Sequence, residues 1–292
     1  MSHFFDMAKF ASIIAGLREH GSAWFTRGVA VLVLLFLFFI AGGGVSQNDK
    51  WKIERVEISG TQTVDQSAIE EFVREKLKGN YYFAYARENS KIFPQREIER
   101  GLQEAFPRLL NVHTENIDPH TISIKVSERK PYALWCGEVY SPELRELNNC
   151  FFIDNTGFVF DSAPTFSEGV YLEVYSGLLG ASEEGMLRAY MLPTQFTLLH
   201  TVTDALTSKI GEPLRVALKP EGEVVVTMKK SASYPMLAGV EVRFKESTTA
   251  ETLMKNLNAA LPVQFPEGVT PKKKLLYIDM RFGNKIFFGF EN

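Results

Sequence analysis

An uncharged apolar run near the N-terminus constrains this 292-residue chain more than any other feature. It extends from Gly28 to Val45 and reads GVAVLVLLFLFFIAGGGV. A helix of about 20 apolar residues crosses the hydrocarbon core of a bilayer, and in lipid a helix satisfies its own backbone hydrogen bonds. The run therefore predicts a transmembrane helix at 28–46, preceded by a short tail at 1–27 and followed by one large folded portion.

A cleaved signal peptide is the alternative for this run, because Ala41 and the glycines after it could offer a cleavage site. The leading segment is long for a signal peptide and contains Asp6 and Glu19, which favours an uncleaved anchor. The basic residues near the two ends of the run do not decide its orientation. Arg27 directly before the run and the two later cysteines favour a cytoplasmic tail and an exterior bulk.

The composition of the chain agrees with a folded exterior portion. The net charge is −3 and 45% of the residues are hydrophobic, so nothing indicates a nucleic-acid-binding protein. The length after the run is sufficient for one or two ordinary domains.

The first part of the exterior, 51–128, alternates between strand and helix patterns. A strand with Ile58 ends at a Ser-Gly turn, and an apolar stripe around Val73 then predicts a helix that stops at Gly79. The helix has the spacing of a capping box that begins at Ser67. A second helix is predicted from Pro94, followed by two strands. This order predicts an α+β unit with two helices on one face of a three-stranded sheet.

The second part, 129–292, is predicted to be mostly antiparallel strands with two helices. The helices are expected near 182–210, with a break at Pro193, and at 249–261. Strands are expected at 132–136, 151–154, 158–161, 214–218, 223–228, 240–244, 275–282 and 285–290.

Several segments together resemble the FtsQ/DivIB family of bacterial cell-division proteins. The matching segments are IERVEISG at 53–60, HTISIKVSERKPYALW at 120–135, FFIDNTGFVFD at 151–161 and the closing Tyr277-Ile278-Asp279-Met280-Arg281. The resemblance implies a POTRA domain (polypeptide-transport-associated domain) at 51–128 and a β domain at 129–292, both after a single membrane span. The aromatic segment 81–93 is longer than the usual link between the two POTRA helices.

The resemblance also implies a function. It is that of a bitopic, non-enzymatic scaffold of the divisome, located in the cytoplasmic membrane at the division septum. Such a scaffold recruits small coiled-coil division proteins (FtsB/DivIC-like and FtsL-like) and other divisome membrane proteins. A POTRA-bearing accessory protein of export or envelope assembly remains the alternative, although one POTRA pattern and no set of long barrel strands is visible.

No combination of residues typical of an enzyme or a cofactor site stands out. Ser127 and Lys130 have Ser-x-x-Lys spacing, but they lie at a strand end before a proline and lack the partner motifs. His113 and His120 have no Cys or carboxylate at metal-ligand spacing. We therefore expect no catalytic residue, no metal and no cofactor.

The two cysteines, Cys136 and Cys150, lie in the exterior portion. Their number and compartment favour a disulfide, and two free buried thiols are the alternative.

The chain ends in an aromatic hairpin whose turn begins with Gly283-Asn284, which fits a type II′ turn. Alternation places Ile286, Phe288 and Phe290 on one face, and Lys285 and Phe287 on the other. The strand is expected either to cover the core or to serve as a sheet edge that accepts a partner strand. The resemblance points to this hairpin for partner binding, and the expected residues are Tyr277, Arg281, Lys285, Ile286, Phe287, Phe288 and Phe290.

Overall fold

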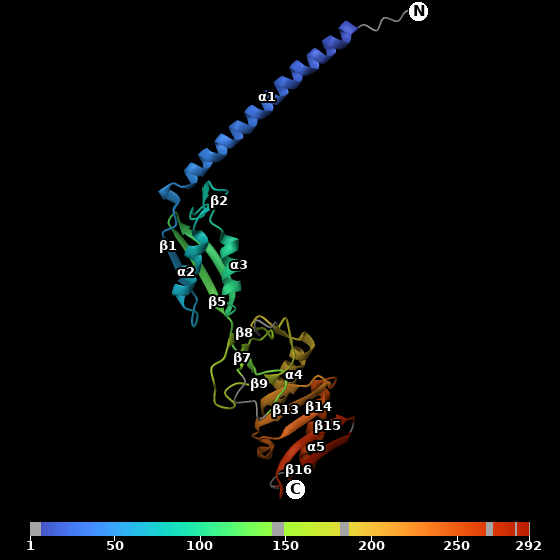
Figure 1. The fold of residues 1–292 in the computed structure, drawn as a ribbon. Coiled ribbons are helices and arrows are strands. Elements are labelled where there is room, and N and C mark those ends of the chain that lie inside the picture. Colours follow the sequence, from blue (N-terminus) through green and yellow to red (C-terminus); the bar gives the residue numbers. More distant parts are fainter. Residues whose placement is uncertain (1–6, 142–148, 182–186, 267–270, 284, 292) are drawn as a thin grey trace, which may run out of the picture. The chain divides into compact units, whose positions relative to one another are not determined.

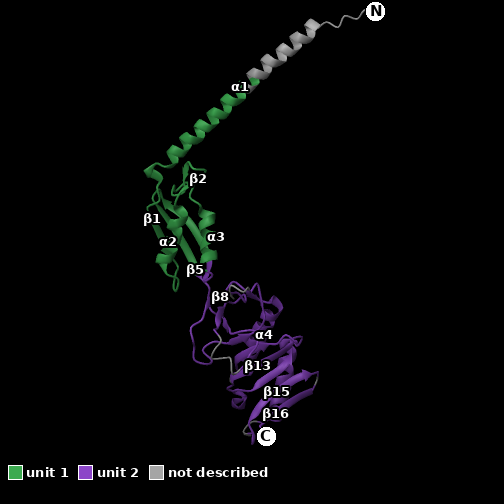
Figure 2. Cartoon of the chain, in the orientation of Figure 1, with its two compact units in different colours: residues 1–106, 111–127 green, residues 107–110, 128–292 purple. Residues whose placement is uncertain are grey.

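The structure is a computed structural model, and it describes residues 7–141, 149–181, 187–266, 271–283 and 285–291. The chain divides into two compact units, coloured separately in Figure 2. Unit 1 comprises residues 1–106 and 111–127, and unit 2 comprises residues 107–110 and 128–292. The main division falls between Ser127 and Glu128, one residue before the boundary expected from the sequence.

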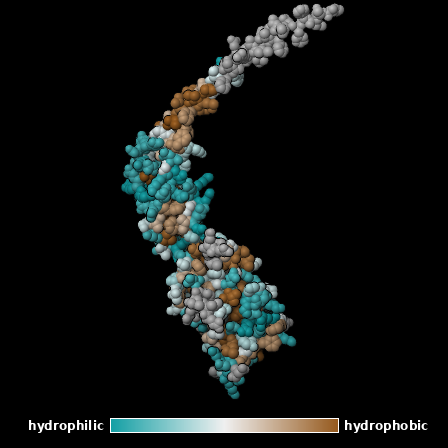
Figure 3. Space-filling view, viewed as in Figure 1, coloured by the Kyte–Doolittle hydropathy of each residue, from teal (hydrophilic) through white to brown (hydrophobic). Residues whose placement is uncertain are grey.

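Unit 1 begins with the long helix α1, Met7–Ser46. Its segment Thr26–Ser46 is the one stretch in the described residues that is long and apolar enough to cross a membrane. The apolar side chains of this segment are mostly exposed, as Figure 3 shows by their colour. This exposure distinguishes α1 from the buried core helix of a soluble protein.

A small α+β core follows the helix. Its elements are η1 (Asp49–Trp51), β1 (Arg55–Ser59), α2 (Gln66–Leu77), α3 (Gln95–Ala105), β4 (Leu109–Asp118) and β5 (Thr121–Glu128). The sheet has the order β1-β5-β4, with β1 parallel to β5. Figure 1 shows α2 and α3 side by side over this sheet. Their buried residues are Ile69, Val73 and Leu77 on α2 and Ile98 and Leu102 on α3.

Two local features of unit 1 differ from the sequence expectation. Helix α2 is capped by Asp65, whose carboxylate accepts a hydrogen bond from the Ser67 N–H at 2.9 Å, so Ser67 is not the N-cap. A free carboxylate is at least as good a cap as a hydroxyl, and it lies two residues earlier. A short hairpin, β2 (Asn80–Tyr81) with β3 (Tyr85–Ala86), also occupies the link between α2 and α3.

Unit 2 contains a nine-stranded sheet. Its strands are β6 (Ala133–Trp135), β7 (Phe151–Ile153), β8 (Val159–Ser162), β9 (Glu173–Tyr175), β12 (Glu212–Leu218), β13 (Glu223–Lys230), β14 (Glu241–Lys245), β15 (Leu275–Phe282) and β16 (Lys285–Phe290). The strand order is β16-β15-β14-β13-β12-β9-β6-β7-β8. The pairs β6·β9, β9·β12 and β14·β15 are parallel and the other pairs are antiparallel, so the sheet is mixed but mostly antiparallel, as expected.

The expected helix near 182–210 is shorter than its apolar pattern indicated. Helix α4 is Pro193–Lys209, and Pro193 is its first residue instead of a break within it. Proline suits this position because the first N–H of a helix needs no partner there. The preceding residues form the short pair β10 (Leu178–Leu179) and β11 (Tyr190–Met191), and the expected residues 182–186 lie outside the described part.

The core of unit 2 lies between the sheet and two helices, α4 and α5 (Ala250–Gln264). Both helices contribute to the same hydrophobic cluster, with Leu206 of α4 and Leu257 of α5 among its fully buried members. Val226, Phe244 and Ile278 meet them from the sheet. One face of the central and C-terminal strands is therefore covered by helices. The other face carries polar side chains beside a second, smaller apolar cluster that includes Ala217 of β12 and Val225 of β13.

Candidate partner-binding edge

The last strand, β16, is one edge of the nine-stranded sheet. It pairs with β15 on one side and with no strand on the other side among the described residues. The opposite edge, β8, is different because the chain covers it. Val159 there donates its N–H to the carbonyl of Ala189 at 2.9 Å, and its own carbonyl accepts the N–H of Arg188 at 2.8 Å. An uncovered edge presents backbone groups that can accept another strand.

The direction of each backbone group on β16 follows from the hydrogen bond next to it. The N–H of Glu291 donates to the carbonyl of Lys274 at 2.9 Å, so Glu291 points toward the β15 side. Residues two apart on a regular strand point the same way, and both register shifts lie on β15, leaving β16 regular. The backbone groups of 285, 287 and 289 therefore face β15, and those of Ile286, Phe288 and Phe290 face outward.

The side chains of those same three residues close the core. Ile286, Phe288 and Phe290 are partly buried and pack against the main cluster of unit 2. The ring of Phe265, just after α5, contacts Phe288 at a centroid distance of 5.7 Å and Phe290 at 6.5 Å. The side chains of these residues therefore cover the core, and their backbone forms one edge of the sheet.

The other face of the hairpin carries exposed apolar groups. Phe287 is 49% exposed and its ring meets that of Phe282, itself 58% exposed, edge to face at 5.6 Å. Gly289 lies beneath the ring of Tyr277, where a Cβ atom would come within 2.3 Å of the ring carbons. The Tyr277 ring thus occupies the place of the missing side chain, a known way to stabilise glycine in a strand.

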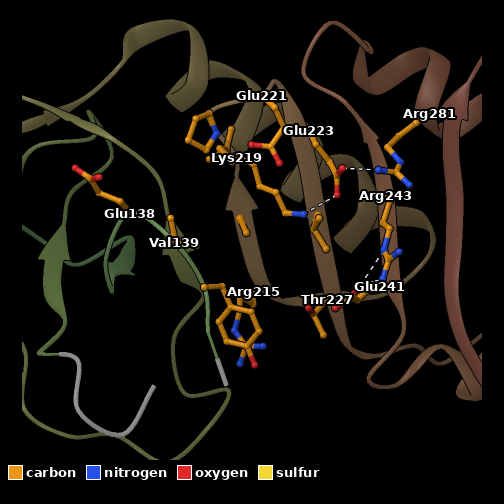
Figure 4. A pocket seen from close by; sticks show the side chains of 15 residues that line it. Glu138, Val139, Arg215, Lys219, Glu221, Glu223, Thr227, Glu241, Arg243 and Arg281 are labelled. Atoms are coloured by element: carbon orange, nitrogen blue, oxygen red, sulfur yellow. Dashed lines mark hydrogen bonds and ion pairs between the residues drawn. The ribbon is translucent and has the colours of Figure 1, made fainter. Parts of the chain in front are cut away.

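Arg281 belongs to an ion-pair network on this face, shown in part in Figure 4. Its guanidinium binds Asp279 through Nε at 2.9 Å and Nη2 at 2.6 Å, and Nη1 pairs with Glu223 on β13. Lys219 also binds Glu223, at 2.9 Å. The hydrogen bonds from Arg281 hold the pKa of Asp279 below its ordinary value despite burial of the carboxyl.

The network determines what Arg281 can offer a partner. Three of its nitrogens are already bound within the chain, so Arg281 fixes β15 beside the neighbouring strands. Arg243 stacks over the Tyr277 ring at 4.5 Å and also binds Glu241. Arg243, Glu241 and Arg281 line part of a concavity of roughly 690 Å³ on the sheet face, which extends toward β12 (Figure 4). Of the expected binding residues on this face, Lys285 and Phe287 are exposed.

The two cysteines lie on either side of the loop that joins β6 to β7. Cys136 follows β6 and Cys150 precedes β7, and their sulfur atoms form a disulfide with a Cα–Cα distance of 4.2 Å. Because β6 and β7 pair antiparallel, the bond joins the two strands at the end from which their connecting loop leaves. It lies several strands away from β16 in the sheet order and takes no part in the edge.

Two basic residues at the start of unit 2 bind the two aspartates of the segment FFIDNTGFVFD. Arg129 pairs with Asp154 at 2.6 Å and stacks over the Phe158 ring at 4.2 Å. Arg108 pairs with Asp161 at 2.7 Å. Both aspartates thus have structural partners within unit 2.

The residues considered for chemistry have local roles in the structure. The Ser127 hydroxyl accepts a hydrogen bond from Asn111 at 3.1 Å, and His120 lies 2.9 Å from the carbonyl of Lys52. His113 is within 3.9 Å of Glu99. Within the described residues, no three His, Cys, Asp or Glu side chains gather as a metal site would require.

No family model and no curated protein sequence matches the chain.

Proposed function

We propose that this chain is a bitopic, non-enzymatic membrane scaffold of the bacterial divisome that recruits septal division proteins through strand β16. The single observation that carries the proposal is the edge of β16, which no strand covers in the part of the chain that the structure describes. A strand that adds to this edge would bind the outward backbone groups of Ile286, Phe288 and Phe290, and main-chain hydrogen bonds supply the affinity in such complexes.

The residues of β16 favour an edge that pairs with a partner strand over an edge that stays exposed to solvent. Proteins usually protect exposed edges with prolines, bulges or charges that point inward. Here the six residues Lys285–Phe290 contain three phenylalanines, no proline and one charge, at the turn end. The two register shifts both add a residue to β15, so β16 itself stays regular. Such a strand is suited to pairing.

The edges of the sheet in unit 1 have more protection. At Thr114 on β4, the N–H donates to the Glu99 carboxylate at 2.7 Å and the carbonyl accepts from the Gln95 amide at 2.6 Å. Side chains of α3 therefore block this edge near its middle. The other edge, β1, carries the charged residues Arg55 and Glu57. The strand-helix-helix-strand-strand order of unit 1 and the apolar helix before it support the family resemblance.

The experiment is capture of partners by the full chain in detergent-solubilised membranes of the source organism. The proposal predicts that the chain retains single-span proteins with coiled coils that are required for septation. A variant that blocks the edge, Ile286→Pro, should release them while the Cys136–Cys150 disulfide and the fold remain intact. Capture of outer-envelope assembly proteins instead would favour the alternative function, an accessory protein of export or envelope assembly. If Ile286→Pro retains the septal partners as well as the wild type does, the contact lies elsewhere on the chain.

A further inference from the structure

The short hairpin β2–β3 places two large aromatic side chains in the open. Tyr82 and Phe83, which we call the aromatic tip, are 78% and 73% exposed. Large apolar side chains exposed side by side indicate a surface that is covered in the working protein. The position of the aromatic tip relative to helix α1 indicates what covers it.

The backbone at the aromatic tip is held in a conformation that these residues disfavour. Tyr82 has a φ of 45° and Phe83 a φ of 60°, and the N–H of Ala84 closes the turn on the carbonyl of Tyr81 at 3.1 Å. A β-turn in which both central residues have a positive φ normally contains Asn-Gly. Strained backbone of this kind persists only where the surrounding structure holds it, and it is concentrated at functional sites. The chain therefore keeps two aromatic rings at a position where smaller residues would fold more easily.

Helix α1 and the hairpin are packed closely together. A Cβ atom on Gly43 would lie 2.7 Å from that of Ala84, and one on Gly42 would lie 2.7 Å from the Tyr85 hydroxyl. Asn89 donates a hydrogen bond to the carbonyl of Ser46 at 2.7 Å, and the Ser46 hydroxyl accepts the N–H of Ala86 at 3.1 Å. Glycines permit this approach, as they do between helices in membranes. The hairpin is thus fixed to the end of the apolar segment.

The contacts also set the depth of the aromatic tip along the helix. Ala86 is hydrogen-bonded to Ser46, and Ala84 lies against Gly43. Further along the helix, the Phe83 ring contacts that of Phe39 at a centroid distance of 5.8 Å. From Ser46 back to Phe39 the helix descends seven residues, about 10 Å at 1.5 Å per residue. If Thr26–Ser46 crosses a bilayer, a tip at the level of Phe39 lies within the leaflet next to unit 1.

The residues behind the tip have the composition of a membrane interface. Lys50 and Lys91 both lie over the Trp51 ring, at 5.8 and 4.6 Å, and Arg87 lies over the Tyr81 ring at 5.1 Å. Aromatic rings with adjacent Lys and Arg side chains are typical at the level of lipid headgroups. The apolar rings at the tip and the cations behind them thus follow the same sequence as the layers of a bilayer, in which the hydrocarbon core is followed by the charged headgroups.

We propose that the aromatic tip inserts into the leaflet next to unit 1 and anchors that unit to the membrane beside α1. The inference rests on the proposed membrane span of α1, because the helix sets the level of the tip. Lipid, rather than a protein partner, is the occupant that this depth and this order of side chains support.

The test uses the full chain in lipid vesicles, with its disulfide intact and one environment-sensitive fluorophore on a single added cysteine. Three positions are compared: Val33→Cys in the apolar segment, Phe83→Cys at the tip and Ala105→Cys at the exposed end of α3. Nitroxide groups on the lipid acyl chains quench fluorophores that lie in the bilayer. Circular dichroism checks that each variant folds.

We expect a blue-shifted emission that the lipid nitroxides quench at positions 33 and 83, and an unquenched emission at position 105. Quenching at 33 together with an unquenched label at 83 would overturn the insertion of the tip and leave the span standing. An unquenched label at 33 would overturn the span and the tip with it. The two failures are therefore distinguishable.

Discussion

Asp154 holds a turn and an ion pair at once. Its carboxylate accepts hydrogen bonds from the Thr156 N–H and hydroxyl at 2.8 and 2.6 Å and from the Phe158 N–H at 3.1 Å, and it pairs with Arg129. Burial acts to raise the pKa of Asp154, but these hydrogen bonds outweigh it and keep the pKa below the ordinary value. The free energy that the ionised group contributes is therefore present above about pH 4 and lost as the pH falls further.

Asp154→Ala should lower the free energy of unfolding of unit 2 by about 2–4 kcal/mol, since it leaves Arg129 and two N–H groups without their partner. It should also make the loss of stability below about pH 4 shallower than in the wild type. Urea denaturation at several pH values, followed by near-UV circular dichroism, measures both. Asp161→Ala is the matched control, because that carboxylate is 37% exposed. An equal loss in the two variants would contradict this role for Asp154.

The direction of single N–H groups on β16 predicts opposite effects for neighbouring prolines. Ile286→Pro removes an outward donor, so we expect the fold to persist and partner binding to weaken about tenfold or more. Phe287→Pro removes a donor that faces β15, so it should destabilise the hairpin itself by about 1–3 kcal/mol. Binding assays and thermal unfolding of both variants separate the effects. If Ile286→Pro unfolds the hairpin and Phe287→Pro leaves it stable, the N–H of residue 286 faces β15 and that of residue 287 faces outward, the reverse of this assignment.

Sequence alternation alone was sufficient to predict which side chains of β16 lie on which face. It was not sufficient to predict in which direction each backbone N–H group points. Period-2 alternation puts the Phe287 side chain opposite those of Phe288 and Ile286, as the structure has it. Which N–H groups point outward depends on the neighbouring strand and on its two register shifts, and nothing in the local residues encodes either. The ion-pair role of Arg281 could not be predicted for a similar reason, because its partner Glu223 lies 58 residues away in the sequence.

At the scale of elements, the contact between α1 and the β2–β3 hairpin depends on individual glycines. Gly43→Leu should push the hairpin from the helix, since the new side chain meets the backbone and Cβ of Ala84. Overpacking of this kind costs about 1–3 kcal/mol, so the Ala86 amide should exchange its hydrogen about tenfold faster. Gly44→Leu is the control, because nothing lies within 4 Å of a Cβ at that position. Equal exchange in both variants would show that the close packing is unnecessary.

Elements with long, regular patterns were predictable, and elements defined by distant partners were not. The bounds of β15 and β16 agree with their alternating residues. By contrast, apolar residues near Tyr190 have a helix-like spacing but belong to β11, after Arg188 turns the chain with a φ of 70°. Strand β9 has three buried residues and exists because β6 and β12 flank it in parallel. Three residues are too few to show a period.

For the whole molecule, the sequence was sufficient to predict an apolar helix followed by two folded parts. It could not show which of the sheet edges stays uncovered. That outcome depends on loops and side chains that close other edges, such as residues 188–189 over β8 and Gln95 and Glu99 at β4. The proposal of a recruiting scaffold depends on this difference among the edges, so a direct test must observe the backbone of β16 itself.

Residue-resolved amide hydrogen exchange along β16 is that test. The full chain would be measured alone and with the single-span coiled-coil protein that it captures from membranes. Our account predicts that 287 and 289 exchange slowly in both samples. The amides of Ile286, Phe288 and Phe290 should exchange quickly in the free chain and become protected on binding, as an added strand requires. A bound complex in which these three amides stay unprotected would contradict recruitment through the β16 edge.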